Sequence, residues 1–243
     1  MPQESIARTA STTDAAPAIG QGLIARIKHL VLESNINDNA FYRTFKAAPL
    51  DATKLKDVFQ QYYYYIRTFP QILAGLAGRV DNEVVRMKLS RTVVSELGDN
   101  GEGKPHFVMF EDVLASVGVQ LNDWREVQHI PEAVALVDGL RELFLEKPAN
   151  CALGAHYVIE EFGFPMIVAL YEGFRNYDGW QHSDYAYFYL HLLIEANHVD
   201  WIGAAVLEAA RDTRSSEQIE RGAREALVLL NNFWSGLDRL ARA

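Results

Sequence analysis

Apolar positions recur along most of the chain at intervals of three and four residues, in segments of helical length that end at glycine, proline or short polar stretches. No segment alternates apolar and polar residues as a half-buried strand would. The best strand candidate is the tyrosine run in VFQQYYYYI, but only Pro70 interrupts the helical pattern around it, so we interpret this stretch as helix. The pattern predicts helices over the segments 21–35, 38–47, 51–79, 81–98, 106–118, 131–146, 148–176, 183–209 and 215–241.

Capping and turn residues support several of these boundaries. Asp51 and Ser183 can cap helix N-termini, and Pro131 and Pro148 stand where a first helical turn tolerates proline. Neither an internal repeat nor a long linker divides the chain. We therefore predict a single all-α domain over residues 20–243, preceded by a disordered tail over residues 1–19 that is rich in Ala, Ser and Thr.

Composition narrows the class of protein. Of 243 residues, 49% are hydrophobic and 23% charged, which is ordinary for a globular domain. The net charge of -9, without any run rich in Lys or Arg, argues against binding to nucleic acid or to an anionic membrane. The single cysteine, Cys151, cannot form an intrachain disulfide. Since we also see neither a secretory signal nor a run of about 18 apolar residues, we expect a cytoplasmic protein without a membrane span.

The stretch YFYLHLLIEANHVDWIG, residues 187–203, is apolar on nearly every side yet carries His191, Glu195 and His198. On a helix these three positions lie within roughly 60° of one another and form one stripe. An unpaired buried carboxylate is costly, so something must compensate it. Either a metal ion or a hydrogen-bonded His-Glu-His network would do so, and this motif alone leaves both open.

A second polar group lies in the apolar stretch HYVIEEFGFPMIV. Pro165 cannot donate a hydrogen bond to the carbonyl of residue 161, so we expect a helix kink at that point. Because the segment is otherwise apolar, we expect either Glu160 or Glu161 to point inward. His156, five residues before Glu161, falls on a different face from it, and we assign it a supporting or structural role.

A third group lies in SELGDNGEGKPHFVMFEDVLASVG, where Glu96 ends one helical pattern and His106 opens the next. The glycine-rich loop between them must bring the two side chains together. With the two groups above, three histidines and three carboxylates then lie on separate helical segments. Such a donor set, without thiolates, suits a pair of iron or manganese ions held between helices of a bundle, whereas a structural zinc site would more often use cysteines.

In the order and spacing of Glu96-x9-His106, Glu161-x3-Pro165 and His191-x3-Glu195-x2-His198, the chain resembles the haem-oxygenase-like diiron oxidases, over residues from about 40 to 207. The resemblance implies a haem-oxygenase-like bundle of about seven core helices that binds two Fe(II) ions and takes O2 as co-substrate. An external electron donor and a homodimer are compatible with it. The iron ligands that it implies are Glu96, His106, Glu161, His191, Glu195 and His198.

Three details of this resemblance concern single positions. The Glu-x3-Pro context is the reason for preferring Glu161 to Glu160. Glu195 stands where family members usually have aspartate. Some members that oxidise nitrogen carry a further glutamate on the preceding helix, but no carboxylate is found near Pro70 and Gln71, which argues against a seventh ligand.

The activity that the resemblance implies is an O2-dependent oxidation of a small amine or amino-acid-like metabolite. We favour N-oxygenation in a biosynthetic pathway, with oxidative desaturation or carbon-carbon cleavage of an amino acid or fatty acid as the alternative. The tyrosines at 62–65 and Arg67 would offer hydroxyls and a cation to such a substrate, although a tyrosine stripe also serves packing or a dimer face.

Two other classes of function compete with this hypothesis. One is a metal-free, thiaminase-like hydrolase of the same fold group, in which Cys151 would be the nucleophile. That hypothesis leaves the polar stripe of residues 191–198 without a role. The other is a helical binding protein without catalytic activity, whose polar residues form a structural network. The iron content of the purified protein separates the diiron hypothesis from both.

Overall fold

The computed structural model describes residues 12–99, 103–178 and 181–243, except for the side chains of residues 12–18, 182, 183, 194 and 195. The described part is helical and contains no strand, as the sequence predicts. Its helices are α1 (Thr12–Glu33), α2 (Ala40–Ala47), α3 (Ala52–Arg79), α4 (Glu83–Glu96), α5 (His106–Ser116), α6 (Pro131–Arg141), α7 (Ala149–Phe174), α8 (Ala186–Ala209) and α9 (Thr213–Arg242). Two 3-10 turns, Ile36–Asp38 and His182–Tyr185, and a π-helical turn, Glu142–Glu146, join them.

Local sequence signals explain most of the helix ends. The Asp51 side chain accepts a hydrogen bond from the backbone N–H of Lys54 and so caps α3, and Pro131 occupies the first turn of α6. The tyrosine run is helical, and α3 continues through Pro70. The prediction of Ser183 as a cap is wrong, because residue 183 belongs to the 3-10 turn before α8, whose N-cap is Tyr185.

The first helix begins earlier than the domain boundary predicted at residue 20. Helix α1 starts at Thr12, so residues 12–19 of the predicted tail are helical. Residues 1–11 of that tail lie outside the described residues.

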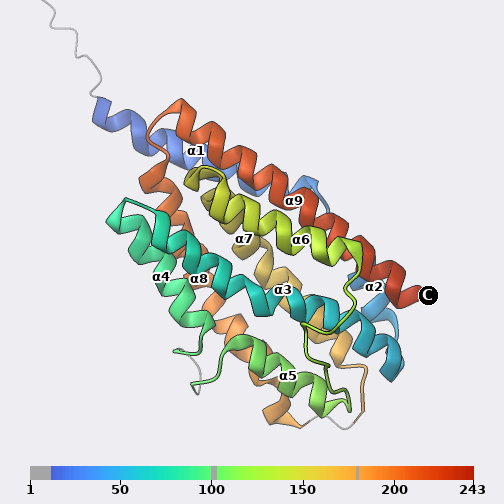
Figure 1. Cartoon of the computed structure of the whole chain (residues 1–243). Helices are drawn as coiled ribbons and strands as arrows, with labels where there is room; N and C mark the ends of the chain where they lie inside the picture. The colour runs from blue at the N-terminus through green and yellow to red at the C-terminus, as the bar shows by residue number, and fades with distance from the viewer. Residues whose placement is uncertain (1–11, 100–102, 179–180) are drawn as a thin grey trace, which may run out of the picture.

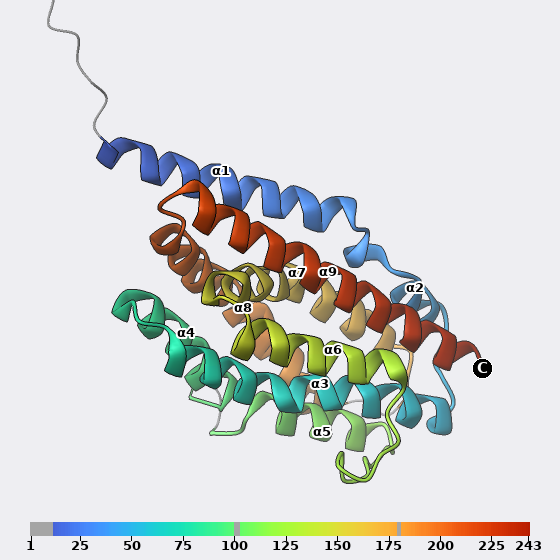
Figure 2. The same cartoon turned by 45° about the horizontal axis from the view of Figure 1, so that its top comes forward.

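Helix α7 forms the centre of the bundle. It packs most extensively against α9 and α8, while α1 and α9 run side by side along one edge (Figures 1 and 2). By length and composition α7 is apolar enough to cross a membrane, but 78% of its most apolar window is buried among the other helices. It is therefore placed as the core helix of this bundle.

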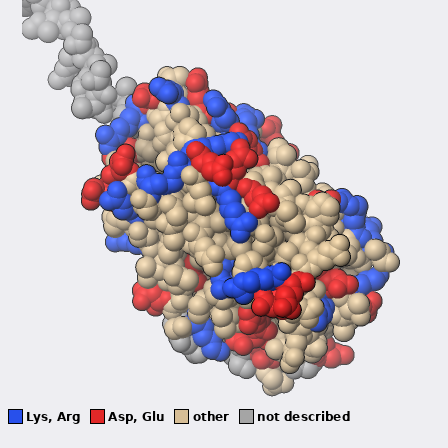
Figure 3. All heavy atoms as spheres, viewed as in Figure 1, with Lys and Arg blue, Asp and Glu red and all other residues tan. Residues whose placement is uncertain are grey.

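Charged side chains are distributed over the surface in both signs. On the face drawn in Figure 3, Lys and Arg are interspersed with Asp and Glu, and uncharged areas separate them. No broad area of positive charge is visible on this face, in keeping with the net charge of -9.

The contact between α7 and α9 depends on two glycines. A Cβ atom at Gly222 would lie 1.8 Å from the backbone oxygen of Cys151, and one at Gly154 would lie 1.8 Å from that of Ile219. Both obstacles are backbone atoms, which cannot turn aside as a flexible side chain would. Glycine at these positions therefore lets the two helices approach closely enough to bury their facing side chains.

We expect Gly222→Ala to lower the free energy of unfolding by about 3 kcal/mol, the upper end of the usual cost of overpacking. Gly78→Ala is the matched control, because a Cβ atom at this exposed position in α3 would meet nothing within 4 Å. It should raise stability by about 1 kcal/mol through helix propensity alone. Urea unfolding of both variants checks this, and equal stabilities would show that the α7–α9 contact can relax.

Candidate metal centre

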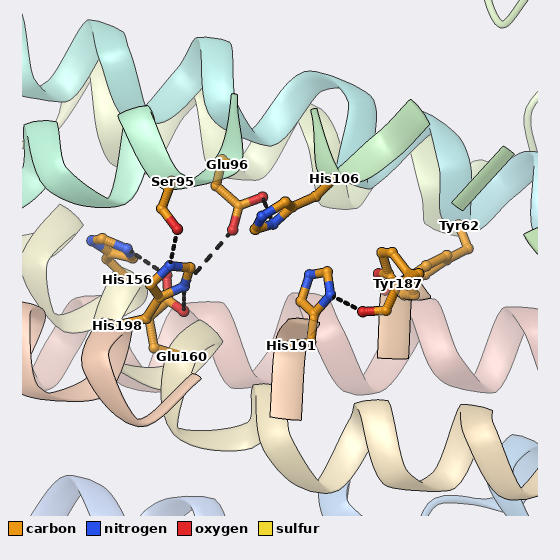
Figure 4. Close-up of polar contacts among 9 residues, drawn as sticks. All are labelled: Tyr62, Ser95, Glu96, His106, His156, Glu160, Tyr187, His191 and His198. Carbon is orange, nitrogen blue, oxygen red and sulfur yellow. Dashed lines mark hydrogen bonds and ion pairs between the residues drawn. The ribbon is translucent and has the colours of Figure 1, made fainter. Parts of the chain in front are cut away.

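Six described polar residues from four helices meet in the interior of the bundle (Figure 4). We call them the His/Glu cluster: Glu96 of α4, His106 of α5, His156 and Glu160 of α7, and His191 and His198 of α8. Five of the six are less than 9% exposed, and only Glu96 is partly accessible. Such a concentration of titratable groups in an apolar core requires compensation by partners or by a bound ion.

A tight turn after α4 brings the first two residues together. Gly98 has φ +106°, and a Cβ atom there would lie 2.6 Å from the backbone of Lys104, so this turn requires glycine. The chain then returns to start α5 with His106. As a result Nδ1 of His106 lies 3.1 Å from Oε2 of Glu96. The sequence prediction that the glycine-rich loop joins this pair is confirmed.

Helix α8 contributes His198 to the same group. Its Nδ1 lies 3.8 Å from Oε1 of Glu96 and 3.3 Å from Oε2 of Glu160. Its Nε2 lies 2.9 Å from the hydroxyl oxygen of Ser95. His198 therefore links the carboxylate of α4 to that of α7.

Glu160, not Glu161, is the carboxylate that α7 directs into the cluster. Its Oε1 lies 2.7 Å from Nε2 of His156, in addition to its contact with His198. Glu161 points elsewhere: its Oε2 accepts a hydrogen bond of 3.2 Å from the Tyr157 hydroxyl and lies 3.5 Å from Nζ of Lys28. The preference for Glu161 is thus corrected, because neighbouring helical residues lie about 100° apart and only one can face inward.

His156 belongs to the His/Glu cluster, although its spacing to Glu161 placed it on a different face of the helix. It is fully buried, and it lies four residues before Glu160 on the same face of α7. This i, i+4 spacing is the signal in the sequence that would have identified the pair. The geometry makes His156 a hydrogen-bond donor that fixes the orientation of Glu160.

His191 is held in a form suited to bind a metal ion. Its Nδ1 lies 2.7 Å from the backbone oxygen of Tyr187. Because a carbonyl can only accept, Nδ1 carries the proton and Nε2 keeps its lone pair. Burial and the nearby His106 lower the pKa of His191 to about 3, so the imidazole is neutral at physiological pH.

The two carboxylates are held in the charged form. Burial acts to raise the pKa of Glu96, but the charge of His106 and the hydrogen bond with it hold that pKa below its usual range. Burial acts likewise on Glu160, and there the charge of His198 and the hydrogen bond with His156 lower the pKa well below its ordinary value. Ionised carboxylate is the form that iron binds.

The donor set fits iron in chemical type, although the described side chains contact one another directly. No three His, Cys, Asp or Glu residues among them surround one point at which a metal ion fits. However, Nε2 of His106 is buried and makes no hydrogen bond within the described part of the chain. The side chain of Glu195, a predicted ligand on α8, lies outside the described residues.

A narrow cavity opens beside the cluster, with about 50 Å³ of room for the centres of water-sized molecules. Its lining combines cluster members with aromatic and aliphatic side chains and includes the residues Tyr62, Tyr65, Phe69, Phe107, Met166 and Tyr187. Among the described residues, this lining contains no Lys or Arg. The cavity therefore offers hydroxyls, carboxylates and apolar surface, but no cation.

Only part of the tyrosine run faces this cavity. Tyr62 and Tyr65 line it, whereas Tyr63 bonds the carboxylate of Glu111 and Tyr64 stacks on other rings. The Arg67 guanidinium lies 4.3 Å from the centroid of the Phe107 ring and is not part of the lining. Of the four tyrosines and Arg67, only Tyr62 and Tyr65 therefore lie where a molecule in the cavity would contact them.

The role of His156 can be tested by replacement. We expect His156→Leu, which removes the donor to Glu160, to weaken Fe(II) binding by about 10- to 100-fold, as is typical when the partner of a metal ligand is lost. His156→Gln keeps a donor at a similar distance from the backbone and should restore most of the affinity. Anaerobic Fe(II) titration of the two variants measures this, and equal losses in both would contradict a positioning role.

Comparison with known proteins places this geometry in context. A family model described as "Iron-containing redox enzyme" matches residues 56–231. The 4-chloro-allylglycine synthase of Streptantibioticus cattleyicolor is 26% identical over 220 residues, which are 90% of this chain and 82% of that protein. The 4-aminobenzoate synthase of Chlamydia pneumoniae is 25% identical over 211 residues, which are 84% and 92% of the two chains.

Solved structures share the fold at low sequence identity. A CADD-like protein of unknown function from Nostoc punctiforme superposes with a TM-score of 0.79 at 18% identity, covering 92% of this chain and 99% of that one. A domain with a heme oxygenase-like fold from Shewanella denitrificans gives 0.70 at 14% identity, covering 89% and 90%. A TenA homolog from Pseudomonas syringae gives 0.72 at 15% identity, covering 97% and 100%. The predicted haem-oxygenase-like fold is confirmed.

Proposed function

Since the chain belongs to the family of iron-containing redox enzymes, we propose that it is an O2-dependent oxidoreductase that holds two non-haem iron ions in the His/Glu cluster. The observation that carries this proposal is the meeting of three histidines and two carboxylates from four helices beside a cavity. The proposed ligands are Glu96, His106, Glu160, His191 and His198, with Glu195 as a sixth on the basis of its spacing.

Four of the six proposed ligands have a local reason to serve. Glu96 and Glu160 are ionised, and Nε2 of His106 and of His191 are the imidazole nitrogens suited to a metal. Bound iron would supply the electrons that activate O2 and the oxidising power of the site. The chain itself supplies apolar surroundings, since aromatic and aliphatic side chains line the cavity around the cluster.

The cavity beside the proposed iron site suits a small substrate, since it has about 50 Å³ of room for the centres of water-sized molecules. The products named in the two curated relatives, an allylglycine and an aminobenzoate, both carry an amino group and a carboxylate. A small amino-acid-like metabolite is the substrate class that we propose.

Two reaction types remain to be distinguished by experiment. N-oxygenation is our prediction from the sequence. The likeness to a 4-chloro-allylglycine synthase over 90% of the chain favours the second candidate, oxidation of the carbon chain of an amino acid by desaturation or cleavage.

A hydrolase that uses Cys151 has less support. The thiol is buried at the crossing of α7 and α9, it does not line the cavity, and burial raises its pKa. A protonated, enclosed thiol is a poor nucleophile. The similarity to a TenA homolog concerns the fold alone.

Cys151→Ala should therefore leave the oxidation of substrate within about twofold of the wild-type rate, because the thiol only fills space in the core. Unfolding measurements on the same variant control for the small loss of packing. A complete loss of turnover in a folded, iron-loaded Cys151→Ala protein would instead favour the hydrolase.

The proposed function is tested by anaerobic loading with Fe(II), exposure to O2, and addition of candidate amino acids and amines. The expected result is O2 consumption that depends on iron and is accelerated by one class of substrate. Product mass then separates the candidates: added oxygen on nitrogen indicates N-oxygenation, and loss of hydrogen or a shorter carbon chain indicates carbon oxidation. Turnover that is unaffected by removing iron would overturn the proposal.

A further inference from the structure

The cavity beside the His/Glu cluster has an accessible side and a closed end. On the accessible side, the described lining residues that solvent partly reaches are Ile66, Glu96 and Phe107. The closed end is formed by three side chains from α3, α7 and α8 that are 0%, 8% and 3% exposed: Tyr62, Met166 and Tyr187. Figure 4 shows Tyr62 and Tyr187 together at one end of the group of residues, with His191 between them and Glu160.

Contacts among these three side chains close the end of the cavity. The hydroxyl oxygen of Tyr62 lies 3.3 Å from that of Tyr187 and 3.8 Å from Sδ of Met166. Behind them, the Tyr62 ring packs at centroid distances of 6.2, 5.1 and 5.9 Å against three fully buried rings, those of Phe59, Phe110 and Trp234. The tyrosine is therefore backed by a packed core and cannot recede. Met166 is the one unbranched, flexible side chain of the three.

The closed end lies about one helical turn from the proposed iron ligand His191. Tyr187 precedes His191 by four residues on α8, and its backbone oxygen lies 2.7 Å from Nδ1 of that histidine. One turn rises about 5.4 Å along the helix, which is the length of a chain of about four carbon-carbon bonds. A substrate can therefore extend only a short chain beyond the iron site.

The closed end suits an uncharged part of a substrate. The three side chains that form it are two phenols and a thioether, none of which carries a charge at neutral pH. An ammonium or carboxylate group placed there would lose its hydration without gaining an ion-pair partner. The charged groups of an amino-acid-like substrate therefore stay on the accessible side, and its hydrocarbon chain points toward Met166.

Resting on the proposed function, we propose that Met166 is a specificity-determining residue, which fixes the length of the hydrocarbon chain that fits beyond the iron site. The substrate class that follows is a short-chain, amino-acid-like molecule, and the long chain of a fatty acid is excluded. Met166 acts by occupying space at the closed end. It contacts the chain of the substrate and takes no part in the oxidation.

The test is a calorimetric titration of full-length, iron-loaded protein in the absence of O2, with straight-chain amino acids from alanine to 2-aminodecanoate as probes. In the wild type we expect the affinity to rise by about fourfold for each added CH2 group until the closed end is filled, and then to fall. Met166→Ala removes the side chain beyond Cβ and should move this limit to chains about three carbon atoms longer.

Met109→Ala is the matched control, because Met109 is a buried methionine of α5 that does not line the cavity. It should leave the limit where the wild type has it. Met166→Val keeps part of the side chain and should move the limit by about one to two carbon atoms, which provides the test if Met166→Ala does not fold.

An unchanged limit in the folded Met166 variants would overturn the inference. An equal shift in Met109→Ala, or a wild type that binds none of the probes, would overturn it as well. These titrations require no turnover. A wild type that shows the expected limit but consumes no O2 with any substrate would instead refute the proposed function and leave the role of Met166 in place.

Discussion

Replacing Glu160 by glutamine will abolish turnover and lower Fe(II) affinity by more than about 100-fold, beyond the usual effect of losing a partner of a metal ligand. The reason is its position: Glu160 is buried and faces His156 and His198 at 2.7 and 3.3 Å. Glutamine has nearly the same size, so the loss is one of negative charge at the metal site. Iron content after anaerobic loading and the rate of O2 consumption measure the two effects.

Glu161→Gln is the control for this change, because the two residues are adjacent on α7. Glu161 contacts Tyr157 and Lys28 near the surface, and an exposed ion pair of this kind contributes little. The variant should bind iron and turn over as the wild type does. The opposite pattern, with Glu161 essential and Glu160 dispensable, would restore the choice made from the Glu-x3-Pro context.

Iron binding will also raise the hydrogen-exchange protection of α8 by about 100-fold when free Fe(II) exceeds its dissociation constant by the same factor. Helix α8 carries His191 and His198, and so its opening would break two of the proposed iron bonds. Because iron binds only the folded site, the free energy of iron binding stabilises the helix that supplies the ligands. Exchange of the apo and Fe(II)-loaded protein, followed by mass spectrometry, reports this by segment.

Helix α6 serves as the internal reference, since it contributes no residue to the His/Glu cluster. Its protection should change far less than that of α8 on loading, provided that it opens independently. Equal protection of α8 with and without iron would mean that protein contacts alone satisfy its polar residues. That result would favour the structural network that the sequence left open.

The fold could be predicted from the sequence because its boundaries are encoded locally. Asp51 and Pro131 act within one helical turn of where they stand, and the glycine-rich loop after Glu96 ends one helix and starts another. Ser183 shows the limit of such signals, because a 3-10 turn precedes α8 and moves the cap to Tyr185. Local chemistry favours a cap, but packing decides where the helix begins.

The candidate site could be predicted from the sequence only where a short loop or helical periodicity brings its residues together. The pairing of Glu96 with His106 follows from a short loop, and the stripe of His191 and His198 follows from helical periodicity. The choice between Glu160 and Glu161 does not follow from helical periodicity, because α7 is apolar on nearly all sides and gives no preferred inward face.

What decides that choice lies far away in the sequence. Lys28 of α1 holds Glu161, while His198 of α8 and Ser95 of α4 define the inner side that Glu160 faces. These contacts join segments that are distant along the chain and appear only once the helices are packed. The sequence analysis assigned His156 a supporting role, and in the structure it contacts Glu160, which lies four residues later on the same face of α7.

The number of iron ions bound per chain tests the central claim most directly. Anaerobic titration of metal-free protein with Fe(II), followed by equilibrium measurement of free and bound iron, gives this number without any knowledge of the substrate. The account predicts two Fe(II) per chain in the wild type and in Glu161→Gln, and fewer than two in Glu160→Gln. A wild-type chain that binds no iron, or that binds it equally well after Glu160→Gln, would contradict the assignment of the His/Glu cluster as a diiron site.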